Sequence, residues 1–234
     1  MNQTKPTLIF DMDGVILDTE QLVRRCWNEI APEFHADAID AVFLTTVGTT
    51  RVHTCSILRE RYGADFPAEE FNNAVSRRYH AIDDIDGVPV KTGARALLQW
   101  ARDNAYTIGL ASSTRQAVVE KELSERGLLP YFDYVLGGDR IARSKPAPDI
   151  YETACRALHA VPADTYAIED SYNGIRAAHA AGMRPIMVPD LLPPTQEMYT
   201  LAAHIFPNLT AFHEFLKRQS THSLPRKGRL FLSK

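Results

Sequence analysis

The chain has 234 residues, of which 45% are hydrophobic and 24% charged, a balance typical of a soluble globular protein and too apolar for a disordered one. Its formal net charge of −3 gives no general attraction to nucleic acid or anionic membranes, so neither is expected as a partner. No stretch approaches the roughly 18 apolar residues that span a bilayer, and acids follow the first short apolar run at once, unlike a secretory signal. Because the three cysteines are widely spaced, we expect reduced thiols and a cytoplasmic protein.

Short apolar runs predict the strands of a parallel sheet at 7–10, 106–112, 134–137, 165–168, 184–188 and, more weakly, 204–206. Helical patterns lie between them at 93–104, 115–126, 148–160 and 172–181. Strands that alternate with helices over short connections predict an α/β protein, with a Rossmann-like, doubly wound parallel sheet as its core.

Residues 19–87 interrupt this alternation and contain no convincing strand. Helical patterns at 19–31, 36–44, 51–62 and 67–82 predict an inserted α-helical cap domain, with hinges near Asp18–Thr19 and near 87–93. The predicted catalytic core therefore combines 1–18 with 88–216. The remaining segment, 217–234, is a basic tail with six cations and no acid. A frayed terminus is the favoured interpretation, and an arm that binds phosphate or nucleic acid is the alternative. A helical insert on two linkers can open and close over a site like a lid.

Polar residues follow three of the predicted strands, and ligands of open parallel sheets bind at the carboxyl ends of strands. They are Asp11, Asp13 and Gly14 after the first strand, Ser112, Ser113 and Thr114 at the second, and Glu169, Asp170 and Ser171 at the fourth, with Lys145 between the last two groups. A single acid after a strand is usually a turn or cap residue, as we expect for Asp18 and Asp149. The three groups and Lys145 are expected at the same edge of the sheet, and this common location favours a functional site over separate turn or cap residues.

Several acids at one edge repel each other, and a divalent cation removes that conflict. Carboxylate oxygens without soft or imidazole ligands are typical of a magnesium site. The ammonium of Lys145, the hydroxyl of Ser112 and the amides that open the next helix are suited to a phosphate. A metal, a phosphate-binding pocket and a free carboxylate together indicate phosphoryl transfer.

Four motifs in this order resemble those of the haloacid dehalogenase superfamily of phosphatases and phosphotransferases. They are DMDGV at Asp11–Val15, LASST matching at Ser112, SKPAPDIY matching at Lys145, and IEDSYNGIRAA matching at Glu169 and Asp170. The insert after the first motif is similar to that of the helical-cap subgroup, in its β-phosphoglucomutase-like branch. The resemblance spans about residues 7–216.

The resemblance implies a role for each matching residue. Asp11 would be the nucleophile that forms an aspartyl-phosphate, and Asp13 the general acid and base. Mg²⁺ would bind the carboxylates of Asp11 and Asp170 and the backbone carbonyl of Asp13, with Glu169 held through water. Four residues would bind the phosphoryl group or substrate: Ser112 and Lys145, with Ser113 and Gly14 as backbone contacts.

Two features narrow the reaction. Dehalogenases of the superfamily lack the second aspartate, so Asp13 favours a phosphate ester, whose leaving alkoxide needs a proton. No lysine occurs from Pro6 through Val90, which disfavours phosphonate cleavage through a cap Schiff base. Arg51, in VGTTR, is predicted to face the cleft between cap and core and to hold a distal anionic group of the substrate.

The main alternative is an isomerase, a β-phosphoglucomutase-type mutase of sugar phosphates. Such mutases carry a cap histidine twelve residues after the nucleophile, and Val23 stands there in this chain. The prediction is therefore a Mg²⁺-dependent phosphatase of a small phosphorylated metabolite, a sugar phosphate or a phospho-acid, as a monomer or weak homodimer. A third possibility is a catalytically silent module that binds a phosphometabolite, but all the catalytic positions are filled.

Overall fold

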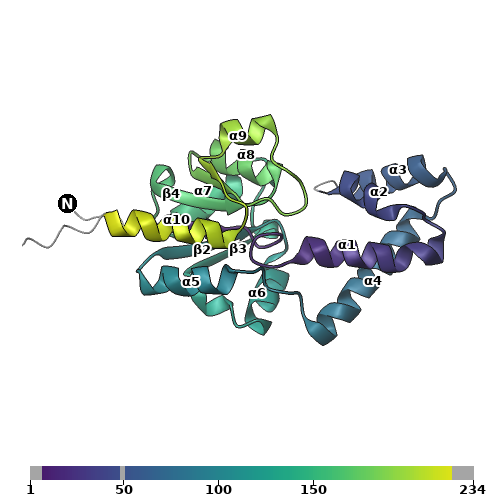
Figure 1. Ribbon diagram of the computed structural model, residues 1–234, viewed down its shortest axis with the longest axis horizontal. Coiled ribbons are helices and arrows are strands. Elements are labelled where there is room, and N and C mark those ends of the chain that lie inside the picture. The colour runs from purple at the N-terminus through teal and green to yellow at the C-terminus, as the bar shows by residue number, and fades with distance from the viewer. Residues whose placement is uncertain (1–6, 48–50, 223–234) are drawn as a thin grey trace, which may run out of the picture.

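The computed structural model describes residues 7–47 and 51–222 (Figure 1). Its core is a six-stranded sheet with strand order β3-β2-β1-β4-β5-β6. All neighbouring strands are parallel. The strands are β1 (Thr7–Phe10), β2 (Thr107–Ser112), β3 (Tyr134–Gly137), β4 (Thr165–Glu169), β5 (Arg184–Met187) and β6 (His204–Ile205). The chain winds outward from β1 in both directions, so the carboxyl end of β1 is the point where ligands bind in such sheets.

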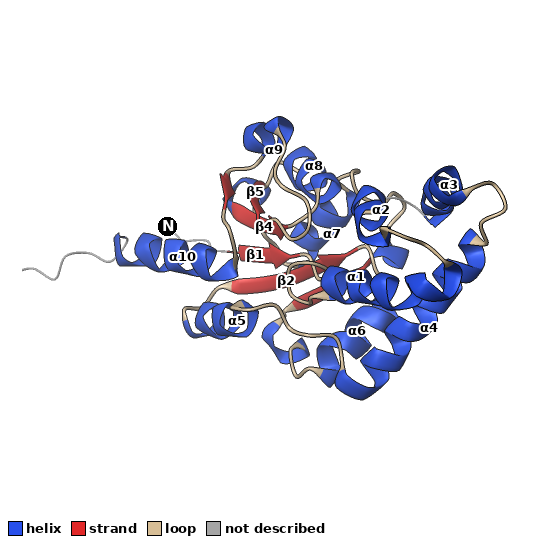
Figure 2. Ribbon diagram, turned by 45° about the vertical axis from the view of Figure 1, so that its right-hand side comes forward, coloured by secondary structure: helices blue, strands red, loops and turns tan. Residues whose placement is uncertain are grey.

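Helices cover both faces of the sheet, which confirms the predicted doubly wound α/β core (Figure 2). They are α5 (Ala94–Asp103), α6 (Gln116–Glu125), α7 (Asp149–Ala157), α8 (Tyr172–Ala180), α9 (Gln196–Leu201) and α10 (Leu209–His222). The alternating side chains of β1 explain the two layers, since successive residues of a strand point to opposite faces. Leu8 and Phe10 share an apolar cluster with residues of α5 and α10, whereas Ile9 packs with α7 and α8.

The α-helices of the inserted segment lie together beyond the carboxyl edge of the sheet (Figure 1). They are α1 (Thr19–Ile30), α2 (Ile39–Thr46), α3 (Arg51–Tyr62) and α4 (Ala68–Asp86). The apolar sides of α1, α2 and α4 meet at Trp27, whose ring centroid lies 5.2 Å from that of Phe43 and 5.0 Å from that of Phe71. We refer to α1–α4 as the cap.

The two linkers between the cap and the core run side by side. The amide of Asp18 donates to the carbonyl of Pro89 at 2.8 Å, and the amide of Lys91 donates to the carbonyl of Ile16 at 2.9 Å. The side chain of Lys91 adds ion pairs to Asp18 (3.2 Å) and to Asp190 (2.6 Å), in the loop after β5. The two linkers are therefore bound to each other and, through Lys91, to the loop after β5.

Some element ends differ from the sequence prediction. The second cap helix begins at Ile39 and not at 36, because His35 and Ala38 adopt left-handed backbone angles (φ 51° and 56°). The last helix, α10, continues through His222, so the predicted basic tail from 217 starts inside a helix. The rest of that tail, 223–234, lies outside the described residues. Among the residues described, no helix is both long and apolar enough to cross a membrane.

Candidate functional site

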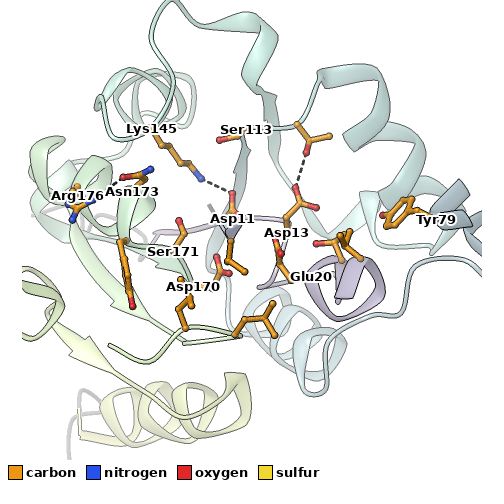
Figure 3. Close-up of a pocket in the computed structure, with 17 residues that line it drawn as sticks. Asp11, Asp13, Glu20, Tyr79, Ser113, Lys145, Asp170, Ser171, Asn173 and Arg176 are labelled. Atoms are coloured by element: carbon orange, nitrogen blue, oxygen red, sulfur yellow. Dashed lines mark hydrogen bonds and ion pairs between the residues drawn. The ribbon is translucent and has the colours of Figure 1, made fainter. Parts of the chain in front are cut away.

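The predicted site residues converge at the carboxyl edge of the sheet, beneath the cap. A cavity of about 680 Å³ opens there, and Figure 3 shows Asp11, Asp13, Lys145 and Asp170 around it. Asp11 and Asp13 follow β1, and Asp170 follows β4, its neighbour in the sheet. The parallel order of the strands thus brings together groups that are far apart in the chain.

Lys145 joins two acids of neighbouring strands. Its Nζ lies 2.6 Å from Oδ1 of Asp11 and 2.6 Å from Oε1 of Glu169, and it donates a third bond to the carbonyl of Ala111 at 3.1 Å. Burial would lower the pKa of this lysine, but the charges of the two acids raise it above its ordinary value. The lysine is therefore a fixed positive charge in the lining of the cavity.

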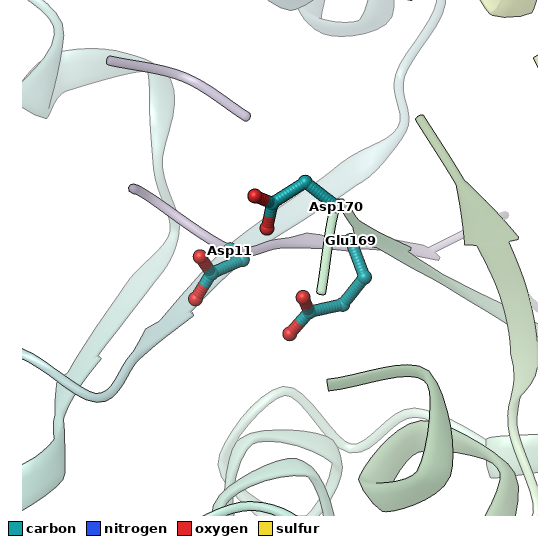
Figure 4. Close-up of side chains that lie close together, drawn as sticks. All are labelled: Asp11, Glu169 and Asp170. Carbon is teal, nitrogen blue, oxygen red and sulfur yellow. The ribbon is translucent and has the colours of Figure 1, made fainter. Parts of the chain in front are cut away.

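Asp11, Glu169 and Asp170 form a cluster in which one carboxylate oxygen of each lies within 4.8 Å of the others (Figure 4). Burial raises the pKa of Asp11 to about 8; the charge of Lys145 opposes this, while those of Glu169 and Asp13 add to it. Burial, Glu169 and Asp11 likewise raise the pKa of Asp170 well above its usual range. One ammonium does not neutralise three carboxylates, so the cluster fits a cation, and its oxygen donors fit a hard one.

Glu169 is the most firmly held member of this cluster. It is fully buried, and its Oε1 accepts a hydrogen bond from the hydroxyl of Tyr151 at 2.6 Å. Its Oε2 accepts one from Oγ of Ser171 at 3.1 Å. The carboxylate lies directly over Gly174, where an added Cβ would come within 2.0 Å of both of its oxygens. Tyr151, from α7, is a supporting residue that the sequence analysis did not single out.

Gly14 allows Asp170 to approach the first motif. Its φ is +74°, a conformation that other residues rarely adopt, and an added Cβ would lie 2.3 Å from Oδ2 of Asp170. Both observations require glycine. The structure therefore gives this residue a steric role beside the acidic cluster, while the predicted backbone contact to substrate stays a prediction.

Asp13 is oriented by hydroxyls from the segment after β2. Its Oδ2 accepts hydrogen bonds from Oγ1 of Thr114 (2.8 Å) and from Oγ of Ser112 (3.3 Å). Ser112 is fully buried, and its Oγ also accepts from the amide of Thr114 at 3.0 Å, so this predicted phosphoryl ligand faces Asp13. Ser113 and Thr114, and not Ser112, line the cavity.

Arg51 does not line the cavity, contrary to the sequence prediction. Its exposed side chain lies against α4, where Nη2 donates to Oδ1 of Asn73 at 2.6 Å. The first residue of α3 is thus directed along the cap and away from the cleft. A role for Arg51 in holding substrate stays a prediction.

The structure adds lining residues that sequence reasoning missed, above all Glu20 and Tyr79 from the cap and Asn173 and Arg176 from α8 (Figure 3). Burial, together with the charges of Asp13 and Asp190, raises the pKa of Glu20 to about 7. The only signal for Glu20 was its position beside the predicted hinge. The others lie on helices whose facing side depends on tertiary packing.

Comparison with known proteins identifies the family. The model of the family described as "Haloacid dehalogenase-like hydrolase" matches residues 8–188. The chain belongs to this family. The sequence-based assignment to the haloacid dehalogenase superfamily is thereby confirmed.

Named relatives support a phosphoric monoester hydrolase. This haloacid dehalogenase-like chain is 30% identical to a fructose-1-phosphate phosphatase, YqaB of Escherichia coli, over 77% of its own length and 95% of the relative's. It is 29% identical to a bifunctional riboflavin kinase/FMN phosphatase of Arabidopsis thaliana over 86% of its length, and spans only 53% of that protein. The solved structure of CbbY from Rhodobacter sphaeroides in complex with phosphate matches with a TM-score of 0.66 and 28% identity, covering 88% and 95% of the two chains.

Proposed function

We propose that this haloacid dehalogenase-like hydrolase is a Mg²⁺-dependent phosphatase of a small phosphorylated metabolite and acts through an aspartyl-phosphate on Asp11. The observation that carries the proposal is the cluster of Asp11, Glu169 and Asp170, whose carboxylate oxygens are close enough to bind one dication. Lys145 binds Asp11, and Asp13 lines the same cavity. A metal site, a cation and two carboxylates are the parts that phosphoryl transfer to a carboxylate needs.

In this proposal Asp11 and Asp170 would hold Mg²⁺, with the backbone carbonyl of Asp13 as a further ligand and Glu169 acting through water. The bound metal would neutralise charge on the phosphoryl oxygens and on the acids around them. The buried acids fit this group because their pKa values are raised, which reflects negative charge that Lys145 alone does not offset.

The side chains then divide the reaction between them. A carboxylate oxygen of Asp11 attacks phosphorus, the phosphorus–oxygen bond of the ester breaks, and the leaving alkoxide takes a proton from Asp13. Asp13, now a carboxylate, accepts a proton from the water that attacks the aspartyl-phosphate, and phosphate and free Asp11 are released. Thr114 and Ser112 bind Oδ2 of Asp13, which leaves Oδ1 for proton transfer. Lys145 offsets charge on the transferring group.

The lining of the cavity supports hydrolysis over the mutase alternative. Val23, from α1, lines the cavity at the position where the mutases carry a histidine. Its side chain cannot exchange a proton or bind a phosphate.

Sugar phosphates and phospho-acids remain the proposed substrates. The cytoplasmic location and the monomeric or weakly dimeric state also stay predictions.

A panel of phosphorylated sugars, acids and nucleotides tests the proposal through phosphate release with Mg²⁺ or EDTA. We expect turnover only with Mg²⁺, and none for Asp11→Asn or Asp13→Asn, with thermal melts to show that both variants fold. Asp103→Asn, an exposed acid of α5, serves as the control with wild-type turnover. Brief reaction followed by borohydride reduction should label Asp11 alone. Turnover by Asp11→Asn would refute the assignment of Asp11 as the nucleophile.

A further inference from the structure

A buried ion pair joins the last turn of cap helix α4 to core helix α6. Asp83 of α4 and Arg126, which directly follows α6, have side chains only 3% and 8% exposed. Nη2 of the arginine lies 2.5 Å from Oδ1 of the aspartate. These charges are not used by the phosphatase chemistry described above, and burying a charge pair is favourable only when its geometry is well satisfied.

The same two residues hold the second linker between cap and core. Nε of Arg126 donates to the carbonyl of Val88 at 2.8 Å, and the amide of Val88 donates to Oδ1 of Asp83 at 3.2 Å. Gly87 lies so close that an added Cβ would be 3.4 Å from Nη2 of Arg126. We call Arg126, Asp83 and Val88 the linker clamp. It fixes the end of α4 and the start of the linker to the core in a single arrangement.

Other charges around the clamp hold Arg126 in place. Its Nη1 donates to the carbonyl of Glu122 at 3.0 Å and lies 2.9 Å from Oε2 of the same residue, whose side chain is 7% exposed. Lys121 lies 4.0 Å from Asp83, but its side chain is half exposed. A solvated ammonium at that distance is a weak substitute for the guanidinium. Arg126 therefore carries the connection.

The clamp is one helical turn from the active-site cavity. Tyr79 precedes Asp83 by four residues on α4, so both side chains lie on one side of that helix. Tyr79 lines the cavity, across from Asp13 (Figure 3). Arg126 therefore binds the same stretch of α4 that brings Tyr79 to the cavity lining.

We propose that Arg126 is a positioning residue that holds the cap in the orientation in which Tyr79 covers the active-site cavity. It touches neither substrate nor reacting atoms, and acts through Asp83 and α4. Without the guanidinium, α4 is free to leave α6, and the covered arrangement of the cavity is less populated. The effect on catalysis rests on the proposed phosphatase function, whereas the effect on the cap does not.

The first experiment measures the cap directly. Spin labels at Glu60→Cys in α3 and Glu152→Cys in α7 occupy exposed positions, while the three native cysteines are buried. We expect Arg126→Gln to broaden the distance distribution between the labels relative to the parent protein. Arg102→Gln removes an exposed arginine whose partner, Asp133, also belongs to the α/β core and not to the cap. This control should leave the distance distribution unchanged. An unchanged distribution in Arg126→Gln would overturn the proposal, even if no substrate were found.

The second experiment separates positioning from general loss of structure. If the covered form falls to about a tenth of its population, KM for fructose 1-phosphate rises about tenfold with kcat nearly unchanged. Simple loss of folded protein would lower kcat and leave KM alone, and would overturn the proposal. Arg126→Lys, which keeps the charge, should raise KM less than Arg126→Gln does. If Arg126→Gln folds poorly, Asp83→Asn should reproduce the rise in KM. In a Tyr79→Ala background, Arg126→Gln should change KM much less.

Discussion

The Nζ atom of Lys145 lies 2.6 Å from Oδ1 of Asp11, although 134 positions separate the two residues in the chain. The pair places a positive charge against the side chain proposed to attack phosphorus. The same nitrogen also binds Glu169, so Lys145 links the ends of β1 and β4. Its positive charge offsets the repulsion between the two acids.

Replacing Lys145 by methionine keeps most of its volume and removes its charge. Loss of one such contact to the transferring group should lower kcat about 10²- to 10³-fold, or about 3–4 kcal/mol of transition-state stabilisation. Steady-state phosphate release measures the effect, with thermal melts to show that the variant folds. A kcat within threefold of wild type would contradict the role given to Lys145.

Stability of the metal-free protein should depend on pH through the acidic cluster. Burial and neighbouring acids raise the pKa of Asp11 from 3.8 to about 8, so the folded chain binds more protons than the unfolded chain between these values. The free energy of unfolding should therefore fall as pH rises from about 4 to about 8. Denaturant titrations in EDTA at pH 5 and pH 8 measure this change.

Mg²⁺ should reverse this loss of stability, and more strongly at pH 8 than at pH 5, because binding requires deprotonated carboxylates. Asp170→Asn removes one proposed ligand and should abolish the stabilisation by Mg²⁺. Equal stabilisation of wild type and Asp170→Asn would place the ion elsewhere.

Gly14→Ala tests the close approach of the first motif to Asp170. The added Cβ would lie 2.3 Å from Oδ2 of Asp170 at a φ of +74°, so the carboxylate must move and Mg²⁺ should bind more weakly. We expect the concentration of Mg²⁺ for half-maximal activity to rise at least tenfold. Gly127→Ala has a similar φ of +61° with nothing within 4 Å of the Cβ, so it controls for backbone strain alone. Equal effects of the two substitutions would rule out the steric role.

The core and its acidic edge were predictable because the signals are local. A strand buried on both faces is a short apolar run, as in Thr7–Phe10, and the residues after it must lie at one edge of a parallel sheet. Asp11 and Asp170 were therefore placed together from the sequence, and the structure brings them into one cluster. Lys145 ends no strand, and it was included because it lies between two of these groups in the chain.

The cap residues were not predictable in the same way. Which side of a cap helix faces the cavity depends on how the helices pack, so Tyr79 lines the cavity and Arg51 does not. Ser112 was correctly placed at a strand end, but its hydroxyl faces Asp13. The partner of Arg126 lies 43 positions away on another helix, a relationship that no local pattern contains.

Val23→His tests why this chain should hydrolyse its phosphoenzyme. Val23 lines the cavity, and the resemblance to the mutases implies that their histidine stands at this position, so an imidazole there should reach the bound substrate. We expect the variant to convert β-glucose 1-phosphate in the presence of its bisphosphate faster than wild type, and to release less phosphate per turnover. A coupled assay for glucose 6-phosphate, run beside phosphate detection, gives the partition of the phosphoenzyme between transfer to sugar and hydrolysis. Val47→His introduces the same ring elsewhere in the cavity lining and should not change it. An unchanged partition in Val23→His would show that residue 23 does not decide between hydrolysis and transfer.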